Sequence, residues 1–134
     1  PSVRALSEFA DKCGTAFQLR DDILGVIGSE EILGKPVGSD LREGKMTVML
    51  YHALVNANEN QRAILMSTAG NASATAAEIA RATDLIIELG GIARAQELAE
   101  SYVRDAALCL DRLPNLQDKE LLLEWARYLI SRNS

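Results

Sequence analysis

Apolar residues recur at steps of three and four along most of the chain, and this spacing is typical of amphipathic helices. The first such stretch runs from Val3 to Ile27, after which Gly28 offers a helix end. Its predicted apolar face comprises Val3, Leu6, Ala10, Cys13 and Phe17. Two further helices are expected from near Thr47 to Val55 and over Glu59–Ser67. A third is expected from a cap at Ser73 or Thr75 to the Gly90-Gly91 pair, and a fourth from Ile92 to Leu113, before Pro114-Asn115. The last is expected around an apolar stripe of Leu121, Leu122, Trp125 and Leu129. Period-two alternation is missing, so we predict an all-α protein of about six helices.

One segment, residues 28–45, lacks any regular period. The period is broken by four glycines and a proline, namely Gly28, Gly34, Gly38, Gly44 and Pro36. We predict a long loop here, and long loops in compact domains are often functional.

Composition narrows the class of protein. The 134 residues fit one domain, and 48% hydrophobic with 25% charged residues is typical of a globular chain. A net charge of −5 argues against nucleic-acid binding, which needs a basic surface. Cys13 and Cys109 lack metal-type spacing and are expected to be buried free thiols. We see no leader and no apolar run long enough to span a membrane, so a cytoplasmic location is expected.

Two adjacent acids, Asp21 and Asp22, lie towards the end of the first predicted helix. Gln18 and Gly25 lie within the same helical band, because residues three and four apart share a face. The carbonyl groups at a helix C-terminus are already partly negative, so a cation should compensate the two carboxylates. That cation could be a basic side chain or a hard metal ion. The simpler alternative is a solvated acid pair.

Two lysines in the predicted loop stand beside glycines, Lys35 after Gly34 and Lys45 after Gly44. Glycine permits close backbone approach, and lysine offers a compact charge to phosphate oxygens. Together with the acid pair, they suggest a metal-bridged diphosphate site; ordinary surface lysines are the alternative. A phosphate loop of the NTPase type is rejected, because five residues separate Gly38 from Gly44 and Met46 follows Lys45.

Other polar residues give weaker signals. His52 is the only histidine and falls in an apolar stretch, so a core or dimer-face position is expected rather than a catalytic one. Glu30 and Glu31 are expected to be solvated, and Arg20 could neutralise part of the acid pair.

The residues around the acid pair match a family pattern. Ala16-Phe17-Gln18-Leu19-Arg20-Asp21-Asp22-Ile23-Leu24 resembles the second aspartate-rich motif of trans-prenyl diphosphate synthases, and residues 34–47 resemble the segment that follows it. Two ordered motifs make this resemblance specific. It implies an isoprenoid synthase-type helical bundle, of which residues 1–134 would be the C-terminal portion. It also implies a homodimer that condenses isopentenyl diphosphate with an allylic diphosphate.

The resemblance also implies roles for individual residues. Asp21 and Asp22 would be catalytic magnesium ligands, and Gln18 a contact on the substrate side. Lys35 and Lys45 would bind the allylic diphosphate, with Lys45 acting on the charge that develops as it departs. The resemblance also implies a role for Asp40, in supporting the metal-bound waters.

This sequence departs from the common family pattern in two ways. The common family motif has an aspartate at the position of Gly25. Some members, notably those of the geranylgeranyl type, resemble the variant found in this sequence. The first aspartate-rich motif, which lies upstream in the family, is absent from these residues. We therefore expect the complete protein to be the active enzyme and the 134-residue chain alone to be inactive. Two alternatives stay open: a non-catalytic helical subunit or interaction module, and a terpene cyclase, which the lysine-bearing loop fits less well.

Overall fold

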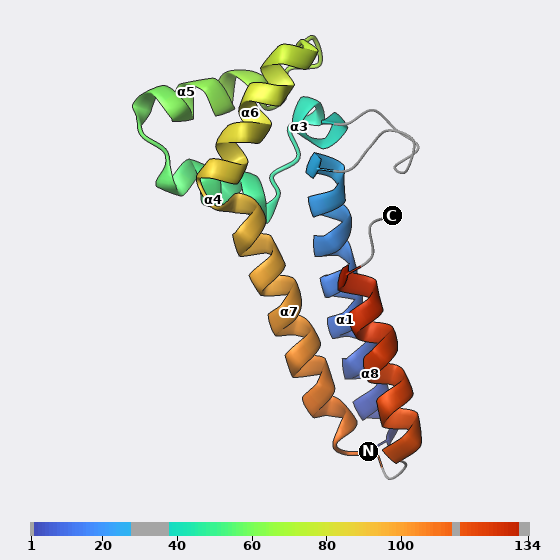
Figure 1. The fold of residues 1–134 in the computed structure, drawn as a ribbon. Coiled ribbons are helices and arrows are strands. Elements are labelled where there is room, and N and C mark those ends of the chain that lie inside the picture. The colour runs from blue at the N-terminus through green and yellow to red at the C-terminus, as the bar shows by residue number, and fades with distance from the viewer. Residues whose placement is uncertain (1, 28–37, 114–115, 132–134) are drawn as a thin grey trace. The chain divides into compact units, whose positions relative to one another are not determined.

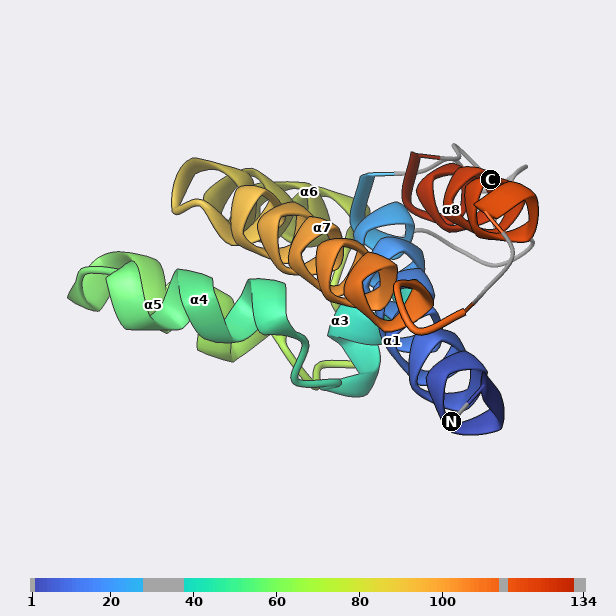
Figure 2. The ribbon, with the colours of Figure 1, turned by 90° about the horizontal axis from the view of Figure 1, so that it is seen from below.

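The computed structural model describes residues 2–27, 38–113 and 116–131, with the side chains of Ser2 and Leu116 left aside. These residues form helices and contain no strand, which confirms the all-α prediction (Figures 1 and 2). The helices are α1 (Ser2–Ile27), α3 (Ser39–Glu43), α4 (Val48–Asn56), α5 (Glu59–Thr68), α6 (Ala76–Glu88), α7 (Gly91–Leu110) and α8 (Leu116–Ser131). None of the helices described combines the length and the apolar character needed to cross a membrane.

The chain divides into two compact units. The first combines α1 up to Asp21 with the chain from Gln96 onwards, and the second runs from Asp22 to Ala95. Each unit is described by itself below.

In the first unit, α1 and α7 pack antiparallel. Arg20 Nη1 donates a hydrogen bond to Gln96 Oε1 over 3.3 Å, whereas Arg112, just after α7, forms an ion pair with Glu8. The buried residues along both helices are mainly small, so the backbones can approach closely. They are Ala5, Phe9, Cys13, Ala16 and Leu19 from α1, and Ala99, Val103, Ala106, Cys109 and Leu110 from α7.

The buried face of α1 is rotated from the predicted one. Cys13 is buried as expected, but Val3 is 82% exposed and Leu6 is also exposed. Helix α8 behaves in the same way: Leu121 and Trp125 of the predicted stripe are exposed, and Ala126 and Ile130 are buried instead. Both helices carry apolar residues on more than one face, so periodicity alone could not select the face that packs. Cys13 and Cys109 are buried free thiols, as predicted.

In the second unit, helices α4, α5 and α6 pack around a common core. Its fully buried members include Ile23, Met49, Leu65, Ala53 and Ala82.

Capping residues set where these helices begin. Thr75 and Asn58 both form capping boxes, with Glu78 and Gln61 respectively, and Thr47 accepts from the Leu50 amide. Each such cap is worth about 1 kcal/mol. The cap predicted at Ser73 or Thr75 is therefore Thr75.

Glycines mark two further boundaries in the second unit. Gly90 has a φ of 85° between α6 and α7, and a Cβ on Gly91 would lie 2.6 Å from the Met49 carbonyl oxygen, so the predicted break at this pair is confirmed. The prediction of an irregular loop over 28–45 is wrong for residues 39–43, which form α3. Gly38 and Gly44, with φ of 85° and 78°, enclose this short helix instead of preventing it. Gly28, residues 29–37 and Pro114-Asn115 lie outside the described residues.

Candidate functional site

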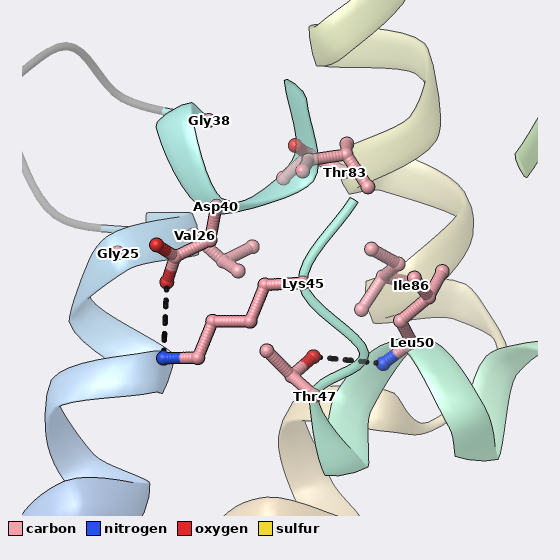
Figure 3. Close-up of a pocket in the computed structure, with 10 residues that line it drawn as sticks. Gly25, Val26, Gly38, Asp40, Lys45, Thr47, Leu50, Thr83 and Ile86 are labelled. Carbon is pink, nitrogen blue, oxygen red and sulfur yellow. Dashed lines mark hydrogen bonds and ion pairs between the residues drawn. The ribbon is translucent and has the colours of Figure 1, made fainter. Parts of the chain in front are cut away.

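Three charged residues of the second unit meet beside the C-terminal end of α1. Lys45 Nζ lies 3.0 Å from Asp22 Oδ1 and 3.8 Å from Asp40 Oδ2. Figure 3 shows the Lys45 side chain extended towards the Asp40 carboxylate. Asp22 comes from α1, Asp40 from α3, and Lys45 from the segment between α3 and α4. Residues far apart in the sequence thus place two acids around one ammonium group.

Backbone hydrogen bonds hold the segment that carries Asp40 and Lys45. The Gly38 amide donates to the Gly25 carbonyl over 3.4 Å, which attaches the start of α3 to the end of α1. At the other end of α3, the Lys45 amide donates to the Asp40 carbonyl over 2.9 Å, and the Gly70 amide donates to the Leu41 carbonyl over 2.8 Å. The positions of Asp40 and Lys45 therefore depend on α3 and on the backbone hydrogen bonds at its two ends.

Burial differs across this ion pair. The side chains of Asp22 and Asp40 are 14% and 18% exposed, whereas that of Lys45 is 45% exposed. The hydrogen bond to Asp22 and the charges of the surrounding acids raise the pKa of Lys45 above its ordinary value, although burial opposes this. The ammonium is therefore fully charged at neutral pH. Two largely buried carboxylates face a cation that still reaches solvent.

A small cavity of about 20 Å³ adjoins these residues, which is room for about one water molecule. Asp40, Lys45, Thr47 and Thr83 give it polar walls (Figure 3). The remaining walls are apolar or backbone, from Gly25, Val26, Gly38, Leu41, Leu50 and Ile86. The cavity is thus lined both by the charged residues and by apolar residues from the core of the second unit.

The structure unites some of the predicted site residues. Asp22 and Lys45 are in direct contact, with Asp40 beside them. Asp21 is half-buried and Gln18 is exposed; both belong to the first unit. Lys35 lies outside the described residues.

His52 is half-buried in α4, with its Nε2 3.3 Å from where a Cβ on Gly90 would lie. Glu30 and Glu31 also fall outside the description.

Sequence reasoning did not identify two neighbours of the site. Thr83 was not singled out from the sequence, yet it lines the cavity. The closeness of Gly25 to Asp40 was also missed, although a Cβ on Gly25 would lie 3.5 Å from Asp40 Oδ2. Helical spacing carries no signal for either contact, because each joins α1 or α6 to a segment whose fold depends on α3.

The donor set suits a hard divalent cation. Magnesium prefers carboxylate and water oxygens, and two carboxylates already converge on one cationic group, Lys45 Nζ. Among the described residues, however, no group of three or more His, Cys, Asp or Glu side chains could hold a metal by itself. Asp22 and its neighbours therefore fit a partial metal site that needs oxygen ligands from water, a diphosphate or other residues.

Comparison with known proteins gives the family. The polyprenyl synthetase family model matches residues 1–86, and the chain belongs to this family. It is 39% identical over 132 residues to a geranylgeranyl diphosphate synthase of Saccharolobus solfataricus, covering 97% of this chain and 40% of that protein. A geranylgeranyl diphosphate synthase of Methanosarcina mazei is 37% identical over 130 residues, with 97% of this chain and 38% of that protein covered. The chain thus spans about two fifths of these relatives.

Solved structures agree with this membership. The geranylgeranyl pyrophosphate synthetase of Pyrococcus horikoshii matches with a TM-score of 0.84 and 34% identity, over 97% of this chain and 39% of that one. The geranylgeranyl pyrophosphate synthase of Corynebacterium glutamicum, solved in complex with isoprenyl diphosphate and magnesium, matches with a TM-score of 0.89 and 31% identity, over 98% and 38%. The chain therefore has the fold of part of an isoprenoid synthase-type helical bundle.

Proposed function

We propose that this chain forms the second metal- and diphosphate-binding wall of a trans-prenyl diphosphate synthase. The complete protein would condense isopentenyl diphosphate with an allylic diphosphate in isoprenoid biosynthesis, as a synthase similar to those of the geranylgeranyl type. The observation that carries this proposal is the contact of Lys45 with Asp22 and Asp40 beside a cavity, in a chain of the polyprenyl synthetase family. Two relatives solved with isoprenyl diphosphate together with magnesium or calcium support it.

The proposed role of each residue follows from its charge. Asp21 and Asp22 would hold magnesium, which neutralises the leaving diphosphate when bound. Lys45, with Lys35, would bind the allylic diphosphate, and Gln18 would contact the substrate from α1. Because the Lys45 side chain is partly exposed and its ammonium is already charged, it would bind a phosphate oxygen in place of Asp22 without a proton transfer. The acids would then be open to the metal at the moment the diphosphate is bound.

Assembly and location remain predictions. We propose a homodimer in the cytoplasm with no nucleic-acid partner. A second possibility is supported by one relative, a protein of Geobacillus stearothermophilus named heptaprenyl diphosphate synthase component 2, which is 35% identical over 133 residues. The complete protein could accordingly be one component of a two-component synthase. In that case it would extend no chain until its partner component was added.

The test uses the full-length protein with isopentenyl diphosphate, an allylic primer and magnesium. We expect magnesium-dependent formation of longer prenyl diphosphates, and no product from the 134-residue chain alone. Absence of chain extension, with the protein folded and both substrates present, would contradict the catalytic proposal. Product from the purified 134-residue chain would contradict the expectation that it is inactive alone.

A further inference from the structure

Helix α3 leads directly into Lys45, yet it is too short to be stable by itself. It has five residues, whereas isolated helices need about 12–15 residues to persist in water. Its N-cap residue, Gly38, gives no side-chain hydrogen bond to the first turn. The position of Lys45 therefore depends on the parts of the second unit to which α3 is attached.

The turn between α5 and α6 contacts α3 at three places. The Gly70 amide donates to the Leu41 carbonyl over 2.8 Å. Arg42 Nε donates to the Ala74 carbonyl over 3.3 Å, in a partly buried place. A Cβ on Gly44, at the end of α3, would lie 3.1 Å from Gly70 Cα, so the two backbones are in close contact. One side chain, that of Arg42, thus reinforces a contact that is otherwise made by backbone.

This turn has a defined structure of its own. The Asn71 amide donates to the Thr68 carbonyl over 3.1 Å, and the Ala74 amide donates to the Asn71 carbonyl over 3.0 Å. The Asn71 side chain accepts a further hydrogen bond from the Ser73 amide over 3.0 Å. Ala74 is also buried in the core of the second unit. A side chain that bonds to the Ala74 carbonyl is therefore attached to a fixed point.

We propose that Arg42 is a positioning residue, which ties α3 to the turn between α5 and α6 and so holds Lys45 where it binds a diphosphate. This inference rests on the proposed function. Arg42 lies three residues before Lys45, and the Lys45 amide donates to the Asp40 carbonyl of the same short helix over 2.9 Å. The half-buried guanidinium of Arg42 stays protonated and remains a donor at any working pH. Arg42 acts through Lys45 and needs no contact with the diphosphate.

The chain offers a matched hydrogen bond for comparison. Arg62 Nη2 donates to the Leu54 carbonyl over 3.1 Å. This is also a bond from an arginine to a backbone carbonyl in the second unit, but it joins α5 to α4 rather than to α3. A purely structural role predicts that the loss of either bond lowers stability and leaves diphosphate affinity unchanged. A positioning role predicts a loss of affinity for Arg42 alone.

The experiment measures binding of inorganic diphosphate to the full-length protein by calorimetry in the presence of magnesium, which needs no turnover. Wild type is compared with Arg42→Met and Arg62→Met. Arg42→Met should weaken diphosphate binding about three- to tenfold, the range expected for the loss of one hydrogen bond. Arg62→Met should bind diphosphate like wild type.

A double-mutant cycle then tests whether Arg42 acts through Lys45. In a Lys45→Gln background, the further change Arg42→Met should alter diphosphate affinity by less than about twofold, because the group that it positions is gone. A loss of the same size in both backgrounds would show that Arg42 acts on the diphosphate independently of Lys45. That result would overturn the inference.

The outcomes separate this inference from the proposed function. If wild type binds no diphosphate with magnesium and extends no chain, the proposed function fails. If wild type does both, but Arg42→Met binds diphosphate as tightly as Arg62→Met, only the role of Arg42 is overturned. Should Arg42→Met not fold, as judged by circular dichroism, Gly70→Ala takes its place. Gly70 has a φ of 78°, so alanine would strain the turn at its other contact with α3. Unchanged diphosphate affinity in the folded Gly70→Ala protein would likewise contradict the tie between this turn and Lys45.

Discussion

Among the described residues, an ion pair in the first unit can be compared with the charged cluster around Lys45 in the second unit, and the comparison distinguishes a structural role from a chemical one. In the first unit Arg112 and Glu8 pair with side chains 43% and 45% exposed. In the second unit Lys45 is similarly exposed, but its partner Asp22 is only 14% exposed and a second acid lies beside it. A pair exposed on both sides contributes little to stability. A shielded acid that faces a partly exposed ammonium group can also attract another cation, such as a metal ion.

The largest expected effect tests this contrast directly. In the full-length protein, Asp21→Ala and Asp22→Asn should each lower the magnesium-dependent rate about 100-fold or more, because they act where charge develops in the transition state. Glu8→Gln, in the exposed pair, should leave the rate unchanged. Steady-state kinetics against magnesium concentration, with thermal unfolding of each variant, would check this. Lost stability with an intact rate would instead indicate a structural acid.

A second prediction compares one glycine from each unit. Gly38 has a φ of 85°, and a Cβ there would lie 2.5 Å from Ile79 Cγ2. Gly38→Ala should therefore destabilise the protein by about 2 kcal/mol. Gly14 lies within α1, and no described residue comes within 4 Å of its Cβ position, so Gly14→Ala should stabilise the protein by about 0.5–1 kcal/mol. Denaturant unfolding measures both.

The interpretation of these glycines would change if the two variants shifted stability equally. An equal loss would mean that the space around Gly14 is filled in the full-length protein. An unchanged stability for Gly38→Ala would mean that α3 can begin without a left-handed residue.

The prediction for Lys45 concerns substrate affinity. Lys45→Gln removes the ammonium that we assign to the allylic diphosphate, and a charged hydrogen bond is worth about 1.5–3 kcal/mol. The KM for the allylic substrate should rise about tenfold or more, whereas Arg112→Gln in the other pair should leave it unchanged. A KM that stays constant while the unfolding temperature falls would assign Lys45 to structure alone.

Much of the fold was predictable from the sequence, because helix periods, capping residues and the Gly90-Gly91 break are local signals. Thr75 and Asn58 begin their helices through residues only three positions away. The buried face of α1 was not predictable, since Val3 and Leu6 are as apolar as Ala5 and Phe9 and only tertiary packing selects between them. For the candidate site, the motif predicted roles for Asp22 and Lys45. Asp22 and Lys45 are 23 residues apart, and their contact depends on α3, as does the position of Asp40 beside Gly25. Helix α3 was not predicted, because the glycines at its two ends were interpreted as part of a loop.

The smallest expected effect concerns pH and the exposed pair of the first unit. The hydrogen bond from Arg112 lowers the pKa of Glu8 below its usual value of 4.5, and burial opposes this only in part. A lowered folded-state pKa means that the contribution of Glu8 is present above about pH 4.5 and is lost as the pH falls through the folded-state value. We expect thermal unfolding of wild type and Glu8→Gln to differ slightly at pH 7 and to converge near pH 3. Because both side chains are well exposed, 1 M salt at pH 7 should remove the same difference. A difference that persisted in acid and in salt would show that Glu8 stabilises the first unit by packing rather than by charge.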